Sequence, residues 1–203
     1  FELGKYEEGI VACDRAIELD KNWGGASPAM VWYMRGVAYS KLKKLSEALF
    51  SYEWAIRLNS GYSLAIAERC LVLSQLEKYA EARDACQQAL DKNGDWGNQT
   101  PAIAWVNLGR IQKQLKQYHQ ALEAYEKALA INPQDAIVWT EHGILLGMFG
   151  KHSQALTSYE WALKINPKYT LALANRCAAF NRLAKYQEAL TSCDSSIQDG
   201  DGK

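Results

Sequence analysis

The chain has 203 residues, and its 23 Lys and Arg residues balance its 23 Asp and Glu residues. A net charge of zero provides no field that would attract nucleic acid or an anionic membrane, so we expect neither as a partner. No stretch approaches the roughly 18 consecutive apolar residues of a transmembrane helix, so the sequence predicts no membrane span.

From residue 29 onward, one local pattern recurs five times, and each copy predicts two amphipathic helices. Apolar residues recur at spacings of three and four, and each first helix carries a small residue with an alanine 12 positions later. The small residues are Gly36, Cys70, Gly109, Gly143 and Cys177, and the alanines are Ala48, Ala82, Ala121, Ala155 and Ala189. Such a period predicts stacked helix pairs, because one pair cannot bury its own apolar faces.

The period also predicts the domain organisation. We expect a single array in which an N-terminal half unit at 1–22 precedes five complete units. These units are 29–62, 63–96, 102–135, 136–169 and 170–203. Two loops between units are longer than the others, and they contain Trp23-Gly24 and Trp96-Gly97. Gly200-Asp201 resembles Gly94-Asp95, where the second of these loops starts. We therefore expect the sequence to be a segment of a longer protein.

Proline and hydroxyl residues predict several helix ends. Ser27-Pro28 and Thr100-Pro101 each offer an N-cap hydroxyl followed by a proline in the first turn. Pro133 and Pro167 are expected just after second helices, since proline cannot continue a helix.

The clearest unit resembles the tetratricopeptide repeat (TPR) family. Its matching residues are Trp105, Leu108, Gly109, Ala121, Tyr125, Ala128 and Pro133. The resemblance implies an all-α fold, a right-handed α-solenoid of helix-turn-helix repeats. It also implies a scaffold that binds a peptide or a partner helix in a concave groove lined by the first helices.

The same resemblance implies which side chains face that groove. They are Tyr33, Val37, Glu68, Leu71, Asn107, Arg110, Glu141, Ile144, Met148 and Asn175. Asn107 and Asn175 could each donate to and accept from a peptide backbone. Glu68 and Glu141 would favour an extended ligand with basic residues beside apolar ones. The alternative is that these four polar residues form a solvated helix edge.

One ligand class of the family is disfavoured. Members that grip acidic chaperone tails use Lys and Asn, then Asn, then Lys and Arg, from three successive first helices. The matching slots hold Tyr33 and Val37, then Glu68, then Ile103 and Asn107. Glu68 would repel a carboxylate, so we expect no binding of such a tail.

Two second helices carry a tryptophan, Trp54 or Trp161, within Tyr-Glu-Trp-Ala at a slot that is usually polar in this family. Exposed tryptophans are enriched in interfaces, so both are candidates for a convex interaction surface. The competing interpretation is that neighbouring Trp-Gly loops cover them.

The cysteines and histidines indicate neither a metal site nor catalysis. All five cysteines stand at packing positions, with no C-x-x-C pair, and the three histidines are scattered. We interpret the cysteines as unpaired packing residues, which favours a reducing, cytoplasmic setting. No nucleophile–base arrangement or glycine-rich phosphate loop is recognisable, so we expect no enzyme activity and no cofactor.

The sequence thus predicts a protein-interaction scaffold with a peptide or protein ligand. Two alternatives stay open. The array could be a self-assembling structural module that associates through uncapped ends, or a regulatory array attached to a catalytic domain outside this segment.

Overall fold

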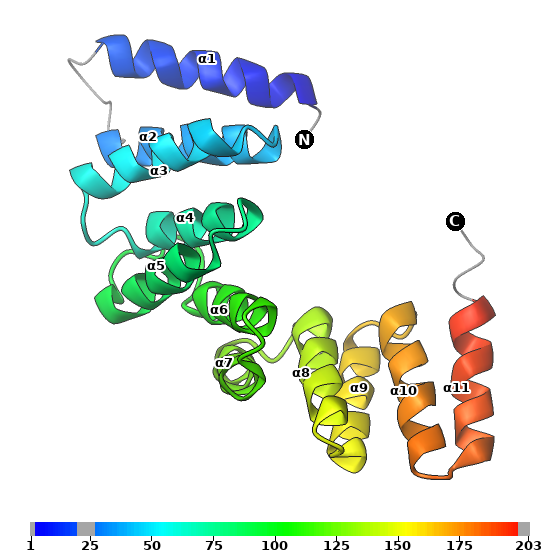
Figure 1. The fold of residues 1–203 in the computed structure, drawn as a ribbon. Coiled ribbons are helices and arrows are strands. Elements are labelled where there is room, and N and C mark those ends of the chain that lie inside the picture. Colours follow the sequence, from blue (N-terminus) through cyan, green and yellow to red (C-terminus); the bar gives the residue numbers. More distant parts are fainter. Residues whose placement is uncertain (1–2, 20–26, 199–203) are drawn as a thin grey trace. The chain divides into compact units, whose positions relative to one another are not determined.

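The computed structural model describes residues 3–19 and 27–198, which form eleven α-helices and no strand (Figure 1). The helices are α1 (Leu3–Leu19), α2 (Pro28–Lys41), α3 (Leu45–Leu58), α4 (Ser63–Gln75), α5 (Tyr79–Lys92), α6 (Ala102–Gln114), α7 (Tyr118–Ile131), α8 (Ala136–Met148), α9 (His152–Ile165), α10 (Thr170–Arg182) and α11 (Tyr186–Gln198). Trp23-Gly24 and Gly200-Asp201, on which parts of the sequence interpretation rest, lie outside the described residues.

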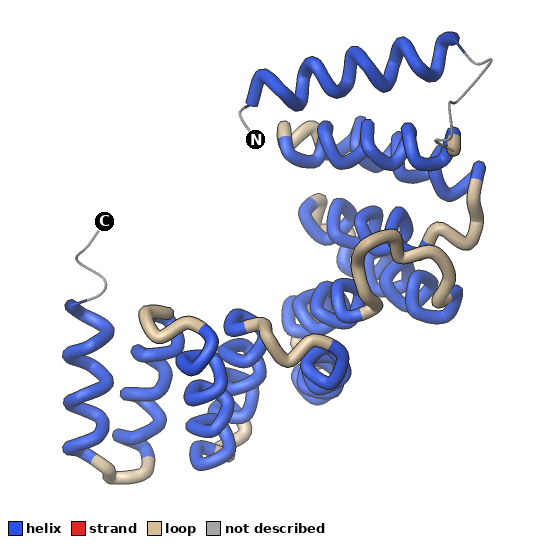
Figure 2. The backbone as a smooth tube through the Cα atoms, turned by 180° about the vertical axis from the view of Figure 1, so that it is seen from behind, coloured by secondary structure: helices blue, strands red, loops and turns tan. Residues whose placement is uncertain are grey.

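The chain divides into two compact units, Phe1–Leu115 and Lys116–Lys203. In the first unit each helix from α1 to α6 packs on the next one, and α4 also contacts α6. In the second unit α7 to α11 pack in the same consecutive manner, and α8 also contacts α10. Within each unit, loops join these helices in the tube view of Figure 2. The consecutive packing confirms the predicted all-α helical repeat.

A residue with positive φ lies in each three-residue link that joins two paired helices of the same unit. The φ values are 60° at Lys43, 61° at Glu77, 73° at Gly150 and 57° at Ala184. The left-handed conformation reverses the chain at once, so the next helix runs back along the one before it. Of these four residues only Gly150 is a glycine, so the other three links accept the cost of a Cβ in this region.

Close packing within a pair depends on the small residue of the first helix. A Cβ on Gly36 would lie 2.6 Å from Cε1 of Tyr52, and one on Gly143 would lie 2.5 Å from Cε1 of Tyr159. Both tyrosines are buried in the second helix of the pair. The small residue thus makes room for an aromatic ring 16 residues later.

The predicted helix ends agree with the structure in all but one case. Ser27 Oγ accepts from the amide of Met30 at 3.2 Å, as an N-cap should. Thr100 makes no side-chain cap, so that prediction is wrong. Its carbonyl accepts from Ile103 instead, because Pro101 already has helical backbone angles. Asp135 caps α8 through the amides of Ile137 and Val138, a cap that the sequence reasoning missed.

The longer loop after α5 is a packed element. Trp96 is buried against Ile66, Ala67, Ala89 and Ala104, and its indole N–H donates to Asn93 Oδ1 at 3.2 Å. Backbone bonds tie this loop to the start of α4, since Leu64 donates to the Asp95 carbonyl at 3.0 Å. The extra residues therefore fill the space between α4, α5 and α6.

Within the described residues, no helix combines the length and apolar character needed to cross a bilayer.

Candidate functional site

Two adjoining hollows follow α2 in the first unit. One, of about 540 Å³, lies between α1 and α2, and its lining includes Lys5, Tyr6, Val37 and Lys41. The other, of about 340 Å³, lies toward the loop after α5, and its lining includes Met30, Tyr62, Asp95 and Asn98. Tyr33 and Met34 line both hollows, so the two adjoin at these side chains, and we call the pair the α2 groove.

The floor of the α2 groove is aromatic and apolar. The ring of Tyr33 packs against those of Tyr52 and Tyr62, with centroids 5.9 and 5.2 Å apart. Burial raises the pKa of Tyr33, and burial also raises the pKa of Tyr62, to about 12. Both phenols are therefore neutral at physiological pH. Met34 is 52% exposed, which leaves a large apolar side chain open to a ligand.

The charges of the α2 groove are separated along its length. Lys5 and Lys41 line the hollow beside α1, whereas Asp95 lines the other hollow. Glu68, predicted to face the groove, is half-buried, and its pKa is raised by that burial, with Lys41 opposing the shift. The carboxyl of Glu68 is therefore less available as an exposed acidic point than the sequence suggested.

The remaining predicted residues of the first unit differ in exposure. Leu71 is half-buried and Arg110 is exposed. Asn107 is only 5% exposed, and its Nδ2 has no hydrogen-bond partner among the described residues. A buried amide nitrogen without an acceptor is costly, and this one is covered by the protein rather than open to a groove.

In the second unit, the predicted groove residues lie on two first helices. Glu141, Ile144 and Met148 share one face of α8, and Met148 is 56% exposed. Asn175 of α10 donates its amide to the carbonyl of Leu171 at 2.7 Å, within its own helix. That bond occupies a donor that we had expected to serve a peptide backbone. The role of each of these residues remains a prediction.

Trp54 and Trp161 are each stacked on a tryptophan of the preceding helix. Trp54 lies on Trp32 with ring centroids 5.6 Å apart, and Trp161 lies on Trp139 at 5.9 Å. The described Trp-Gly loop packs elsewhere, because Trp96 lies between α4 and α6. Trp161 is 42% exposed, so the stack leaves it open to solvent.

Four of the five cysteines form disulfides, which corrects their interpretation as unpaired packing residues. Cys70 is bonded to Cys86 and Cys177 to Cys193, with Cα atoms 5.3 Å apart in both cases, whereas Cys13 is free. Each pair occupies the two positions held by Gly36 and Tyr52 in another repeat, 16 residues apart. This shared spacing was the signal available in the sequence. Paired cysteines do not indicate a reducing compartment, which the sequence predicted from unpaired thiols.

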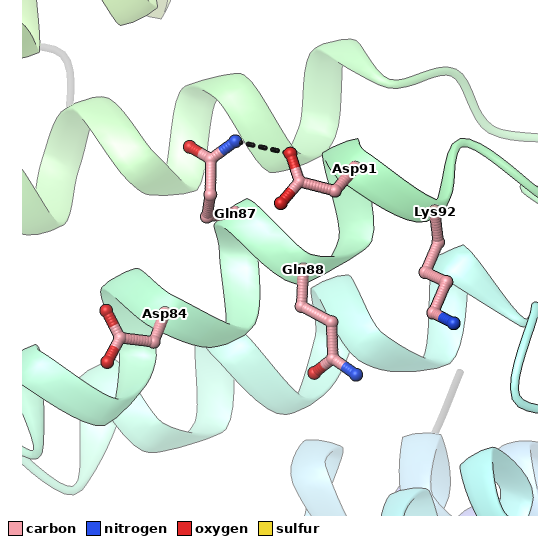
Figure 3. Close-up of a pocket in the computed structure, with 5 residues that line it drawn as sticks. All are labelled: Asp84, Gln87, Gln88, Asp91 and Lys92. Carbon is pink, nitrogen blue, oxygen red and sulfur yellow. Dashed lines mark hydrogen bonds between the residues drawn. The ribbon is translucent and has the colours of Figure 1, made fainter.

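A third hollow, of about 510 Å³, lies along the exposed side of α5 (Figure 3). Gln87 Nε2 donates to Asp91 Oδ1 at 2.8 Å, and Gln88 Oε1 accepts from Arg69 at 2.7 Å. Its lining comes from one helix and consists of polar side chains, several of them already bonded. We assign it no binding role.

These features define a helical-repeat protein with a side-chain groove along one first helix. The tetratricopeptide repeat family model matches two segments of the chain, residues 29–62 and 102–135. Together with the repeat fold, these matches show that the chain carries tetratricopeptide repeats at these two segments. Proteins of this kind are in general protein-interaction scaffolds.

Individual proteins show the same likeness. The Protein STIP1 homolog of Dictyostelium discoideum is 30% identical over 96 residues, a match that covers 45% of this chain and 16% of that protein. The matched region is thus a small part of the curated relative.

Among solved structures, YrrB, described as a TPR protein with an unusual peptide-binding site, has a TM-score of 0.73 and 23% identity, covering 94% of this chain and 93% of that one. A MamA fragment from Desulfovibrio magneticus RS-1 has a TM-score of 0.74 and 15% identity, covering 88% and 98%. At these identities the likeness is one of fold.

Proposed function

We propose that this protein is an interaction scaffold that binds an extended peptide of a partner protein in the α2 groove. The observation that carries the proposal is that two neighbouring hollows share the side chains of Tyr33 and Met34. Concave sites with apolar walls and a few polar groups are the usual form of ligand sites. The described peptide-binding site of YrrB, a protein of similar fold, supports the same class of ligand.

The lining of the groove favours a ligand with a defined direction. An apolar side chain would cover Met34 and the ring of Tyr33, where water is displaced from apolar surface. A basic residue would lie at the Asp95 end, and an acidic residue would lie near Lys41 at the other end. Charge order along the peptide would therefore set its orientation.

A peptide library tests this proposal without knowledge of the natural partner. Peptides of about twelve residues displayed on phage are selected on the wild-type chain, and the enriched sequences are synthesised and titrated by calorimetry. We expect an apolar residue between a basic and an acidic one. Met34→Glu should weaken binding at least about tenfold, because it places a charge in the apolar centre of the groove.

Val11→Glu provides the matched control, since Val11 is also an exposed apolar residue of the first unit and lines neither hollow. This variant should bind the selected peptides as the wild type does. Asn107→Ala tests whether the unpartnered amide takes part. Equal loss of affinity in Met34→Glu and Val11→Glu, or no loss in either, would remove the α2 groove as the binding site.

A further inference from the structure

Two tryptophan stacks in the chain are copies of one another, 107 residues apart. Trp32 and Trp54 correspond to Trp139 and Trp161, and each stack carries a cation on the second tryptophan. Arg57 lies 5.2 Å from the Trp54 centroid, and Lys164 lies 4.7 Å from the Trp161 centroid. The two copies differ in the residues around the first tryptophan of the stack.

In the first unit, the side chain of Arg35 lies beside Trp32, the first tryptophan of the stack. Its Nε donates to Asp14 Oδ1 at 2.6 Å and its Nη1 donates to Ser51 Oγ at 3.0 Å. The guanidinium carbon lies 5.3 Å from the Trp32 ring centroid, a cation–π distance. One arginine side chain is thus held by a carboxylate, a hydroxyl, an indole face and the ring of Tyr39, whose centroid lies 4.8 Å from the guanidinium carbon and where the second unit has Leu146. Phe50 closes the site, with its ring 6.0 Å from that of Trp32.

In the second unit the same acceptors are present, but the arginine is not. Glu126 of α7 is at the position equivalent to Asp14, Ser158 of α9 at that of Ser51, and Trp139 at that of Trp32. His142 replaces Arg35, and Thr157 replaces Phe50. These two replacements by smaller side chains coincide with an open hollow of about 350 Å³ between α7, α8 and α9.

Polar side chains that can accept hydrogen bonds line the hollow, among them Glu126 and Ser158. Ser158 Oγ lies 2.9 Å from His142 Nδ1 and 3.3 Å from the carbonyl of Gln154. His142 Nε2 lies 3.7 Å from Glu126 Oε1. The ionised carboxylate of Glu126 can only accept, so it is suited to a donor that a ligand brings. The Glu126 side chain is 57% exposed, so a ligand can reach it.

We propose that this hollow binds an arginine side chain of a partner protein, in the manner in which the first unit holds its own Arg35. The guanidinium would donate to the Glu126 carboxylate beside His142 and would lie against the Trp139 ring. A planar guanidinium fits these contacts better than an ammonium group, which lacks its fixed fork of donors. The hollow is separate from the predicted groove residues, because Trp139 and His142 lie on the face of α8 opposite Ile144 and Met148.

The test uses a small probe, N-acetyl-arginine-methylamide, titrated into isotope-labelled wild-type chain. The readout is the indole N–H signal of Trp139 and the ring signals of His142 in two-dimensional NMR spectra. We expect saturable shifts for the arginine probe, weaker binding for its lysine analogue, and none for the citrulline analogue, which keeps the shape but not the charge. Glu126→Gln should weaken the arginine probe about tenfold.

Two reciprocal variants make the test specific. His142→Arg rebuilds the arrangement of Arg35 and should abolish the shifts at Trp139, whereas Arg35→His with Phe50→Thr should create a second site reported by Trp32. Thr191→Arg adds a positive charge at an exposed position of α11, away from the hollow, and should leave the affinity for the arginine probe unchanged. Equal binding by the citrulline analogue, or undiminished binding in His142→Arg, would overturn the proposal. Met34→Glu should not alter the probe's affinity, so failure of the α2 groove and failure of this site are distinguishable.

Discussion

Cys70 of α4 and Cys86 of α5 form a disulfide at the two positions where Gly36 faces Tyr52 in the preceding repeat. The same substitution recurs at Cys177 and Cys193. The same two positions of a helix pair therefore hold either of two contacts. One is a tyrosine ring packed against a glycine, and the other is a disulfide between two cysteines. In both disulfide-bonded pairs the two positions are cysteines, so neither cysteine faces a glycine or a tyrosine there.

The disulfides predict that reduction destabilises the protein. A cross-link that closes a loop of about 16 residues contributes about 3 kcal/mol by restricting the unfolded chain. We expect dithiothreitol to lower the urea midpoint, and mass spectrometry after alkylation without reductant to label only Cys13. Cys70→Gly with Cys86→Tyr introduces the glycine–tyrosine contact instead and should fold. Its remaining response to reductant should come from Cys177–Cys193 alone, and an unchanged midpoint of the wild type would contradict the prediction.

The glycines opposite tyrosines predict a sharp contrast between two alanine substitutions. Gly143→Ala would place a Cβ 2.5 Å from the Tyr159 ring, so we expect a loss of about 1–3 kcal/mol from overpacking. Gly147→Ala, one turn further along α8, meets only Tyr159 Oη at 3.8 Å. That change should raise stability by about 0.5–1 kcal/mol, because alanine restricts the unfolded chain. Urea unfolding of both variants measures the difference, and a loss in Gly147→Ala would contradict it.

The N-caps predict which polar side chains matter at helix starts. Asp135→Ala removes an acceptor for two amides of α8 and should cost about 1 kcal/mol. Thr100→Ala removes no side-chain cap and should change the free energy of unfolding by less than about 0.5 kcal/mol. Thermal and urea unfolding of the pair distinguishes a real cap from an apparent one. Equal losses would show that Thr100 has a role beyond the start of α6.

Burial of His142 predicts a pH dependence of stability. Burial lowers its pKa, while Glu126 of α7 opposes the shift, and the α9 residues that line the hollow bring no charge. Because the folded state binds its proton less readily than the unfolded state does, stability should be full above the unfolded pKa of about 6.5 and fall as pH drops below it. His142→Gln keeps a polar partner for Ser158 and should reduce this loss between pH 7.5 and 5. An identical pH profile in both proteins would exclude His142 as the cause.

Much of the architecture could be predicted because a repeat is a property of the covalent chain. The small residues from Gly36 to Cys177 and the alanines that follow them recur in one register, and each copy must bury the same apolar stripe. Helix existence and pairing follow from that pattern. Cap chemistry was less certain, since Thr100 and Ser27 both precede proline but only Ser27 caps its helix.

The site residues were harder to predict, because exposure depends on neighbouring helices. Asn107 was expected to be open and is buried, and the amide of Asn175 bonds to its own helix. Tyr33 lines the α2 groove, and the adjacent Met34, which was not among the predicted residues, lines both of its hollows. Sequence register places a residue on a face but does not say what covers that face.

The sequence by itself determined the repeat period, the helix pairs and the class of protein, because these depend on the order of apolar and small residues along the chain. Only the tertiary structure decided which residues meet. Packing of one helix on the next brings Cys70 to Cys86, Trp139 to Trp161 and His142 to Glu126. These contacts join residues 16 to 22 positions apart, a distance that helical periodicity does not span and that only packing between helices can close.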